Sequence, residues 1–333
     1  MLALLAKQAE YPRMANQRIS AEKRAFIIGA LTEGTPVNAC VRMFRVTKPA
    51  VLRVIAETGE ALARYQSTHF RNLRCARLEL DEQWQYCGKH GQRMSPQEKR
   101  DNPAKGDFWL WCALDPDSKL VVSQRVSGRK WQDAEDFVSD LSRRVEGPVQ
   151  ITSDALAQYE RPIRYYFQRE GMSYGTETKV FVDPPTLASW QKSRRNGIQQ
   201  IAKATREAVI GKPNLQTSTT AHVERLFLSV RQELTRFTRC TLGYSKSLKM
   251  HRLSVSLHFG IYNLCRRHTS LGGQTPAQAA GIESSRWSFE DVVKMTDAYW
   301  QPILAKRTAE KAQSRRAAED EAFMAALAEL EKP

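Results

Sequence analysis

The amino-acid sequence predicts an α/β protein with a mixed sheet, preceded by a small all-α domain. The prediction rests on three observations. Residues 20–58 carry apolar residues at helical spacing, in short segments separated by capping residues. Residues 75–126 then change to the alternation that is typical of β-strands. Beyond residue 131 an amphipathic helix, a short apolar strand and a second helix are expected in turn.

Three short helices are expected at the start of this pattern. Ser20, Thr35 and Thr47 stand before the apolar segments, where their hydroxyl oxygens can accept hydrogen bonds from the free backbone N–H groups of a helix. In the third helix the apolar residues face inward, whereas Lys48 and Arg53 lie on the outside. The third helix therefore presents a basic outer face.

Three helices with a tight turn between the last two form the pattern of a helix-turn-helix domain, and we assign residues 18–65 to it. The last helix of such a domain enters the DNA major groove by its N-terminal residues, which places Lys48 and Arg53 for contact. A generic three-helix protein-interaction domain is the alternative that the helix lengths also permit. The basic outer face favours DNA binding.

Residues 72–285 are expected to form the larger domain. Its predicted elements are three antiparallel strands, a helix, a buried strand and a further helix, at residues 75–86, 108–114, 120–126, 131–145, 149–152 and 155–168. Turn residues such as Asp115-Pro116-Asp117 separate the strands. This order of elements predicts an RNase H-like fold with a mixed sheet flanked by helices.

Two segments fall outside that pattern. Residues 183–220 are polar and basic, and we interpret them as an insertion that contacts nucleic acid through Lys192, Arg194 and Arg195. A solvated basic helix is the alternative. Residues 286–333 become rich in alanine, glutamate, lysine and arginine, and a helical C-terminal tail is expected there.

The composition indicates a polyanionic partner. The chain has 51 Lys and Arg against 36 Asp and Glu, a formal net charge of +15, spread along its whole length. Its six cysteines never form a C-x-x-C pair, which excludes a zinc ribbon, so any metal must be held by carboxylates. No apolar stretch approaches the roughly 18 residues of a membrane span, and we expect a cytoplasmic protein that acts on DNA.

Three acidic residues stand where the predicted fold brings them together. Asp81 is expected to end the first strand, Asp154 ends the strand after the first helix, and Glu224 opens a helix from residue 222 to 237. Since the first and fourth strands lie side by side, both aspartates reach one edge, which the later helix crosses. Glu82 is a rival to Asp81, but strand alternation directs the two side chains to opposite faces, so only one is expected at the site.

Oxygen ligands of this kind suit Mg²⁺, for which Mn²⁺ would substitute. Two such ions about 3.5–4 Å apart can activate the attacking oxygen of a phosphodiester reaction and neutralise the leaving oxygen. On the helix that Glu224 opens, Arg231 lies on the same face two turns later. We expect Arg231 to hold a DNA phosphate near the metal ions.

Several phrases of the sequence also follow an order known from one protein family. They are Arg71–Cys75, Leu80–Trp84, Trp109–Asp115 and Ser153–Tyr159, then Val223–Arg225, Arg236–Arg239, Tyr244–Lys246, Tyr262–His268 and Thr275–Ile282. As an ordered set, between about Ala21 and Val293, they resemble the DDE transposases of the insertion-sequence-one type. No single phrase is specific.

The resemblance implies that Asp81, Asp154 and Glu224 are a catalytic triad that acts with Mg²⁺ on the terminal inverted repeats of a mobile element. It also implies cleavage and strand transfer on double-stranded DNA, and a homodimer or higher homo-oligomer, since two element ends and a target must be handled together. The sequence departs from the family in two places. Ala155 follows the second aspartate instead of glycine, and Leu226 and Phe227 replace the usual Gln-Asn.

Two alternatives to an active transposase stay open. The first is an RNase H-like nuclease, because the fold alone does not fix the substrate. The second is a catalytically weakened DNA-binding repressor derived from a transposase. The N-terminal helices argue against the first alternative, and the retention of all three acids argues against the second.

Overall fold

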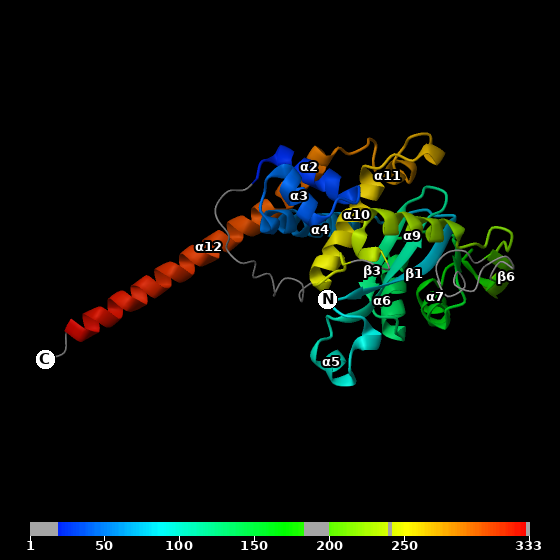
Figure 1. Ribbon diagram of the computed structural model, residues 1–333, viewed down its shortest axis with the longest axis horizontal. Coiled ribbons are helices and arrows are strands. Elements are labelled where there is room, and N and C mark those ends of the chain that lie inside the picture. The colour runs from blue at the N-terminus through cyan, green and yellow to red at the C-terminus, as the bar shows by residue number, and fades with distance from the viewer. Residues whose placement is uncertain (1–18, 183–199, 239–241, 331–333) are drawn as a thin grey trace.

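The computed structural model describes residues 19–182, 200–238 and 242–330 of the chain. A central sheet carries helices on its faces, and a cluster of helices from both ends of the chain lies beside it (Figure 1). The last helix, α12 (Phe289–Leu330), projects from this body (Figure 1). Among the described residues, no helix combines the length and apolar composition that a membrane span requires.

The sheet has six strands within the described part of the chain, in the order β3-β2-β1-β4-β5-β6. They are β1 (Arg77–Cys87), β2 (Gly106–Leu114), β3 (Val121–Ser127), β4 (Gln150–Ser153), β5 (Ser173–Val182) and β6 (Gln200–Ile210). The first three form an antiparallel meander. Strand β4 pairs in parallel with β1, β5 pairs in parallel with β4, and β6 is antiparallel to β5. The sheet is therefore mixed, as predicted.

The helices are mostly short. The α-helices before α12 are α2 (Ala21–Thr32), α3 (Val37–Phe44), α4 (Lys48–His69), α5 (Pro96–Asp101), α6 (Trp131–Ser142), α7 (Glu160–Tyr166), α9 (Ala221–Glu233), α10 (Leu248–Leu264) and α11 (Pro276–Ala279). Single 3₁₀ turns are η2 (Gly91–Arg93), η3 (Ala157–Tyr159), η4 (Thr235–Phe237) and η5 (Thr269–Leu271).

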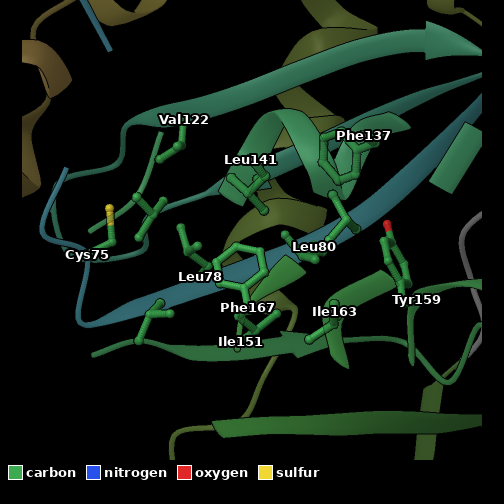
Figure 2. Close-up of a cluster of buried hydrophobic side chains, with 14 of the residues drawn as sticks. Cys75, Leu78, Leu80, Val122, Phe137, Leu141, Ile151, Tyr159, Ile163 and Phe167 are labelled. Atoms are coloured by element: carbon green, nitrogen blue, oxygen red, sulfur yellow. The ribbon is translucent and has the colours of Figure 1, made fainter. Parts of the chain in front are cut away.

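Each face of the sheet buries one set of alternating side chains. On one face, Leu78 and Leu80 of β1 pack against Phe137 of α6 and Ile163 of α7, and Tyr159 lies at one end of this cluster (Figure 2). On the other face, apolar residues of β2 and β3 pack against α9 and α10, with Phe259 fully buried among them. Helices on both faces thus fix the position of β1 in the centre of the sheet.

The order of elements confirms the predicted RNase H-like fold. Three antiparallel strands lead into helix α6, and the chain returns through β4, which lies beside β1 rather than beside β3. Helix α7 then connects β4 to β5, the next parallel neighbour. This arrangement brings the ends of β1 and β4 to one edge of the sheet.

Two of the predicted elements differ in the structure. The helix expected over residues 155–168 is shorter, because the chain turns through η3 before α7 begins at Glu160. The basic insertion expected over residues 183–220 contains strand β6, which pairs with β5 at the edge of the sheet. Charged residues are ordinary on an edge strand that is open to solvent. Because β6 is rich in charged residues, its sequence shows no apolar alternation, and the strand was not predicted.

The three N-terminal helices are present, but the predicted Thr35 cap is wrong, because α3 begins after Pro36 and no side chain caps its first turn. Helix α4 is also longer than expected, at 22 residues. The Ser20 and Thr47 hydroxyls accept hydrogen bonds from backbone N–H groups of the first turns of α2 and α4. Gly34 takes a φ of +87° after α2, a conformation that glycine adopts without steric cost. Arg45 ends α3 in the left-handed region, which makes the turn before α4 tight.

These helices share their hydrophobic core with the C-terminal part of the chain. Ile27 of α2 and Val51 of α4 belong to the same buried cluster as Ile261 of α10 and Val292 of α12. Helix α4 crosses α10 so closely that a Cβ on Gly59 would lie 2.2 Å from a backbone oxygen of Leu253. The N-terminal helices are thus held firmly against the α10 helix that covers the sheet.

Candidate active site

Asp81 lies within β1, at the point where the strand loses one of its neighbours. The pairing of β1 with β4 ends at Leu80 and Ser153, whereas pairing with β2 continues to Cys87. The expectation that Asp81 ends the strand is therefore wrong, because β2 supports β1 for six more residues. Asp81 instead begins the segment of β1 that has no strand on the β4 side.

Asp154 follows β4 directly. Its Oδ1 accepts a hydrogen bond from the backbone N–H of Leu156 at 3.1 Å, which folds the chain away from the sheet. Because β1 and β4 are parallel neighbours, Asp154 comes to the same edge as Asp81. The structure thus brings together the two aspartates that the sequence predicts to meet.

Glu82 lies in the same place. Asp81, Glu82 and Asp154 each offer a carboxylate oxygen, and these oxygens lie within 4.8 Å of one another. We call these three residues the carboxylate group. The expectation that only one of the adjacent acids can reach the site is wrong. Beyond the last β1–β4 pair no strand separates the two faces of β1 at this edge, so side chains from both faces can turn toward it.

The carboxylate group is half-buried, and its negative charges lie close together. Burial, together with the charges of Glu82, Asp154 and Glu224, raises the pKa of Asp81 to about 8. Burial and the charge of Asp154 raise the pKa of Glu82 to about 7, although Arg129 counteracts this. The guanidinium of Arg129 lies 3.0 Å from Glu82 and 4.0 Å from Asp154. Arg129 thus lies within ion-pair distance of two of the three carboxylates.

Glu224 lies in the first turn of α9, next to this group but outside it. Its Oε1 accepts hydrogen bonds from Lys179 Nζ at 2.6 Å and Thr220 Oγ1 at 2.9 Å. Its charge still contributes to the raised pKa of Asp81 and of Asp154. Glu224 is therefore close to both aspartates while its carboxylate is paired with a lysine of β5.

A buried acid that sequence reasoning missed fixes this helix. Glu79 of β1 has 2% of its surface exposed and points to the same face as Asp81, two residues later. Its Oε2 accepts hydrogen bonds from the backbone N–H groups of His222 and Val223, at 2.9 and 3.0 Å. Its Oε1 lies 2.6 Å from Nδ1 of His222. Glu79 thus ties the start of α9 to the strand that carries Asp81.

Glu177 of β5 supports the same helix from the other side. Its Oε2 accepts a hydrogen bond from the backbone N–H of Thr220 at 3.0 Å, and Lys179 and Arg206 form ion pairs with the carboxylate. Although burial opposes it, these partners lower the pKa of Glu177 to about 2. Glu177 is therefore a structural anion that orients both Thr220 and Lys179 toward Glu224.

An open pocket of about 410 Å³ adjoins the carboxylate group. Glu82, Trp84, Trp109, Arg129 and Arg231 line it. Arg231 of α9 therefore shares this pocket with Glu82, and its contact with a DNA phosphate stays a prediction. The two tryptophans were missed, although strand alternation places Trp84 on the same face as Glu82.

The other residues predicted to contact DNA are spread along the chain. Lys48 is exposed at the first position of α4, and Arg53 is half-buried further along the same helix. Lys192, Arg194 and Arg195 lie outside the described residues. Two further basic residues of the segment 183–220, Lys203 and Arg206, lie on β6, and Arg206 is paired with Glu177.

The donor atoms of the carboxylate group fit a divalent cation. Mg²⁺ binds oxygen at about 2.0–2.1 Å, so two oxygens on one ion lie within about 4.2 Å of each other. The 4.8 Å group needs only a small side-chain shift to reach that spacing. Among the described residues Glu82 Oε1 is buried without a hydrogen-bond partner, which a cation would relieve. The set contains only hard oxygen donors, which favours Mg²⁺ or Mn²⁺ over zinc.

In the absence of metal, the stability of the protein relative to an Asp81→Asn variant should depend on pH. The pKa of Asp81 is about 8 in the folded state, against about 3.9 in an unfolded chain. Between these values the folded state keeps a proton that the unfolded chain releases, so stability falls as pH rises through this window. Asparagine does not titrate. The parent should lose up to about 1.4 kcal/mol per pH unit relative to the variant.

Urea unfolding of both proteins in chelator, from about pH 5 to about pH 7.5, measures this difference. Asp101→Asn, which removes an exposed carboxylate from α5, is the matched control and should leave the pH dependence unchanged. A constant difference between the parent and Asp81→Asn across this range would contradict the raised pKa.

Comparison with known proteins gives likeness to solved structures only. No protein-family model matches the chain, and no curated protein matches it. The chain is similar to a piggyBac transposase synaptic complex with hairpin DNA, at 13% sequence identity and a TM-score of 0.37, over 91% of this chain and 77% of that one. It is also similar to a Mos1 transposase paired-end complex with the left transposon end, at 10% identity and a TM-score of 0.22, over 52% of this chain and 64% of that one.

Proposed function

We propose that this protein is a DNA transposase, which cuts and joins the ends of a mobile DNA element with divalent metal ions. The observation that carries the proposal is the carboxylate group, in which three acids converge at the β1–β4 edge of an RNase H-like sheet. Structural acids are normally paired with cations, whereas here Arg129 pairs with Glu82 and Asp154, and Asp81 forms no ion pair among the described residues. The ordered sequence phrases that resemble insertion-sequence-one transposases support the same function.

Asp81, Asp154 and Glu224 are the proposed catalytic triad. Bound Mg²⁺ or Mn²⁺ ions, two per site, would supply the activation of the attacking oxygen and the neutralisation of the leaving oxygen. Asp81 and Asp154 are already within reach of a shared ion. Glu224 would join them by exchanging Lys179 for the metal, since Thr220 and Lys179 hold only one of its oxygens.

The pocket beside the carboxylate group is the proposed place for the DNA strand. Arg129 and Arg231 offer guanidinium groups that suit phosphate oxygens, and Trp84 and Trp109 offer flat apolar surfaces that suit nucleobases. Arg129 also holds Glu82, so the same arginine links the acids to the bound strand. The pocket therefore orients a phosphodiester toward the acids.

The partners follow from the same chemistry. Two element ends and a target duplex must meet in one complex, so we propose a homodimer or a higher homo-oligomer that acts on DNA in the cytoplasm. The basic net charge of +15 favours association with duplex DNA of any sequence.

The function is tested on a plasmid that carries the DNA flanking this coding region in its source genome. The purified protein should cut at the borders of inverted repeats and join the freed ends to a target plasmid in Mg²⁺ or Mn²⁺, but not in chelator. Sequencing of the junctions measures both steps. Random nicking without joined products would instead indicate a nuclease, and binding to the ends without any cleavage in either metal would indicate a repressor.

The basic face of α4 should recognise the element ends. Lys48→Ala and Arg53→Ala should weaken binding to the ends, and each lost phosphate contact should reduce the salt slope of binding by about one unit. Metal-dependent activity on DNA without the ends should persist, because neither residue is near the carboxylate group. Gel-shift titrations at several salt concentrations measure this, with Lys311→Ala on the exposed part of α12 as the control. Equal binding by all four proteins would remove α4 from DNA recognition.

A further inference from the structure

A second pocket lies away from the carboxylate group, between helix α4, strand β3 and helix α6. Its volume is about 720 Å³, within the range of sites that hold a nucleotide-sized ligand. The lining comes from the C-terminal half of α4, the middle of β3 and the outer face of α6. It shares no residue with the carboxylate group or with the pocket that Trp84 and Trp109 line. Strand β3 is also an edge strand, two places from β1 in the sheet.

The charges that line this pocket are mainly positive. Five arginines and two aspartates line it, at positions 64, 71, 125, 143 and 144 and at positions 136 and 140. Two of the arginines are neutralised, because Arg125 and Arg144 form ion pairs of 2.6 Å with Asp136 and Asp140. The other three form no ion pair with any carboxylate in the described part of the chain. The pocket therefore has an excess of cations.

Arg71 shows the effect of this excess. Its Nε donates to the backbone oxygen of Ser67 at 2.8 Å, and its Nη1 donates to that of Arg143 at 3.1 Å, so the guanidinium is held in place without a counter-charge. Burial and the charges of Arg144 and Arg143 lower the pKa of Arg71, against the opposing charge of Asp140. A bound anion would remove this repulsion.

The pocket also contains buried donors that have no acceptor. Gln66 has 4% of its surface exposed, and its Nε2 has no hydrogen-bond partner among the described residues. The Nε of Arg125 is likewise buried and unpartnered within that part of the chain. Buried donors nearly always find an acceptor, and leaving one unsatisfied is costly. Both orphan groups are donors, so the missing ligand is an acceptor.

We propose that this pocket binds a phosphate group, carried either by a nucleic-acid backbone or by a mononucleotide. The positive excess supplies the charge, and Gln66 and Arg125 supply buried donors for the phosphate oxygens. The proposal does not require the catalytic function, since the pocket shares no residue with the carboxylate group.

The test measures the binding of inorganic phosphate by calorimetry, in chelator and at low salt. Gln66→Met, which keeps the side-chain length and removes the donor, should weaken phosphate binding about tenfold, as should Arg71→Ala. Arg64→Ala changes an exposed residue of α4 and should weaken binding without any effect on folding. Arg316→Ala, on the exposed part of α12, removes the same charge elsewhere and should bind as the parent does.

Two further arms identify the source of the phosphate. A lower salt slope for a short duplex in Arg71→Ala, by about one unit, would assign the pocket to a nucleic-acid backbone. An unchanged slope together with weaker binding of a deoxynucleoside monophosphate would assign it to a mononucleotide. Equal phosphate affinity in the parent, Gln66→Met and Arg64→Ala would overturn the proposal. Asp81→Asn should bind phosphate as the parent does. The phosphate-binding proposal and the proposed transposase function can therefore be contradicted separately.

Discussion

Asp81→Asn and Asp154→Asn should each reduce metal-dependent cleavage of DNA by at least about a thousandfold. An amide keeps the shape of the side chain and loses the charge that holds a dication beside a phosphate. Bound metal contributes several kcal/mol to such a reaction, and each 1.4 kcal/mol is about tenfold in rate. The double variant should be scarcely slower than either single one, because residues of one metal site act as a unit. Single-turnover cleavage of a labelled duplex measures all three.

Two neighbouring acids serve as comparisons. Glu224→Gln should lose cleavage to a similar degree, because the amide lacks the negative charge that would bind a dication in place of Lys179. Glu82→Gln should be affected less, since Arg129 already neutralises this carboxylate at 3.0 Å. End binding should be unchanged in every variant. If Glu82→Gln is inactive while Asp81→Asn cleaves normally, then Glu82 rather than Asp81 is the ligand from β1.

Glu79→Ala should both destabilise the protein and slow cleavage. It removes a buried acceptor from the backbone N–H groups of His222 and Val223. Hydrogen bonds to charged groups contribute about 1.5–3 kcal/mol each, so the loss of two should cost about 3 kcal/mol or more. The first turn of α9 would loosen with them, and Glu224 lies in that turn. Urea unfolding and single-turnover cleavage measure the two effects.

The control for this variant is Glu98→Ala. Glu98 also accepts a hydrogen bond from a backbone N–H at a helix start, that of Ser95 at 2.9 Å, but 45% of its side chain is exposed and it pairs with Lys89 at the surface. Its loss should change stability much less and leave cleavage unaffected. Hydrogen exchange at the amides of His222 and Val223 should accelerate only in Glu79→Ala. Slow exchange at these amides in Glu79→Ala would show that α9 does not depend on Glu79.

Much of the fold could be predicted from the sequence, because the apolar residues of most elements recur at the spacing of either a strand or a helix. The meander β1–β3 alternates around residues such as Leu78 and Leu80, and α6 repeats its apolar residues at helical spacing. The hairpin of β5 and β6 was missed. Many of its residues are polar or charged, and Glu177 of β5 is a buried acid whose paired cations, Lys179 and Arg206, lie in the same hairpin.

The site was only partly readable for a similar reason. Asp81 and Asp154 could be paired from strand order alone, since parallel neighbours end at one edge. Glu82 can reach Asp81 and Asp154 only because β4 ends at Ser153. The sequence of β4 does not show at which residue the strand ends. The buried role of Glu79 depends on a helix that begins more than a hundred positions later, and a single sequence carries no sign of such a distant contact.

The shared core of the N-terminal and C-terminal helices has a consequence for how the chain is made. A ribosome releases α2, α3 and α4 first, but α10 and α12, which complete the same hydrophobic cluster, emerge last. Until then the apolar faces around Ile27 and Val51 have no native cover, and closing so long a loop is slow. Strands β1–β3 can pair before α2, α3 and α4 find their partners in α10 and α12. This hydrophobic cluster can therefore close only after α10 and α12 have been synthesised.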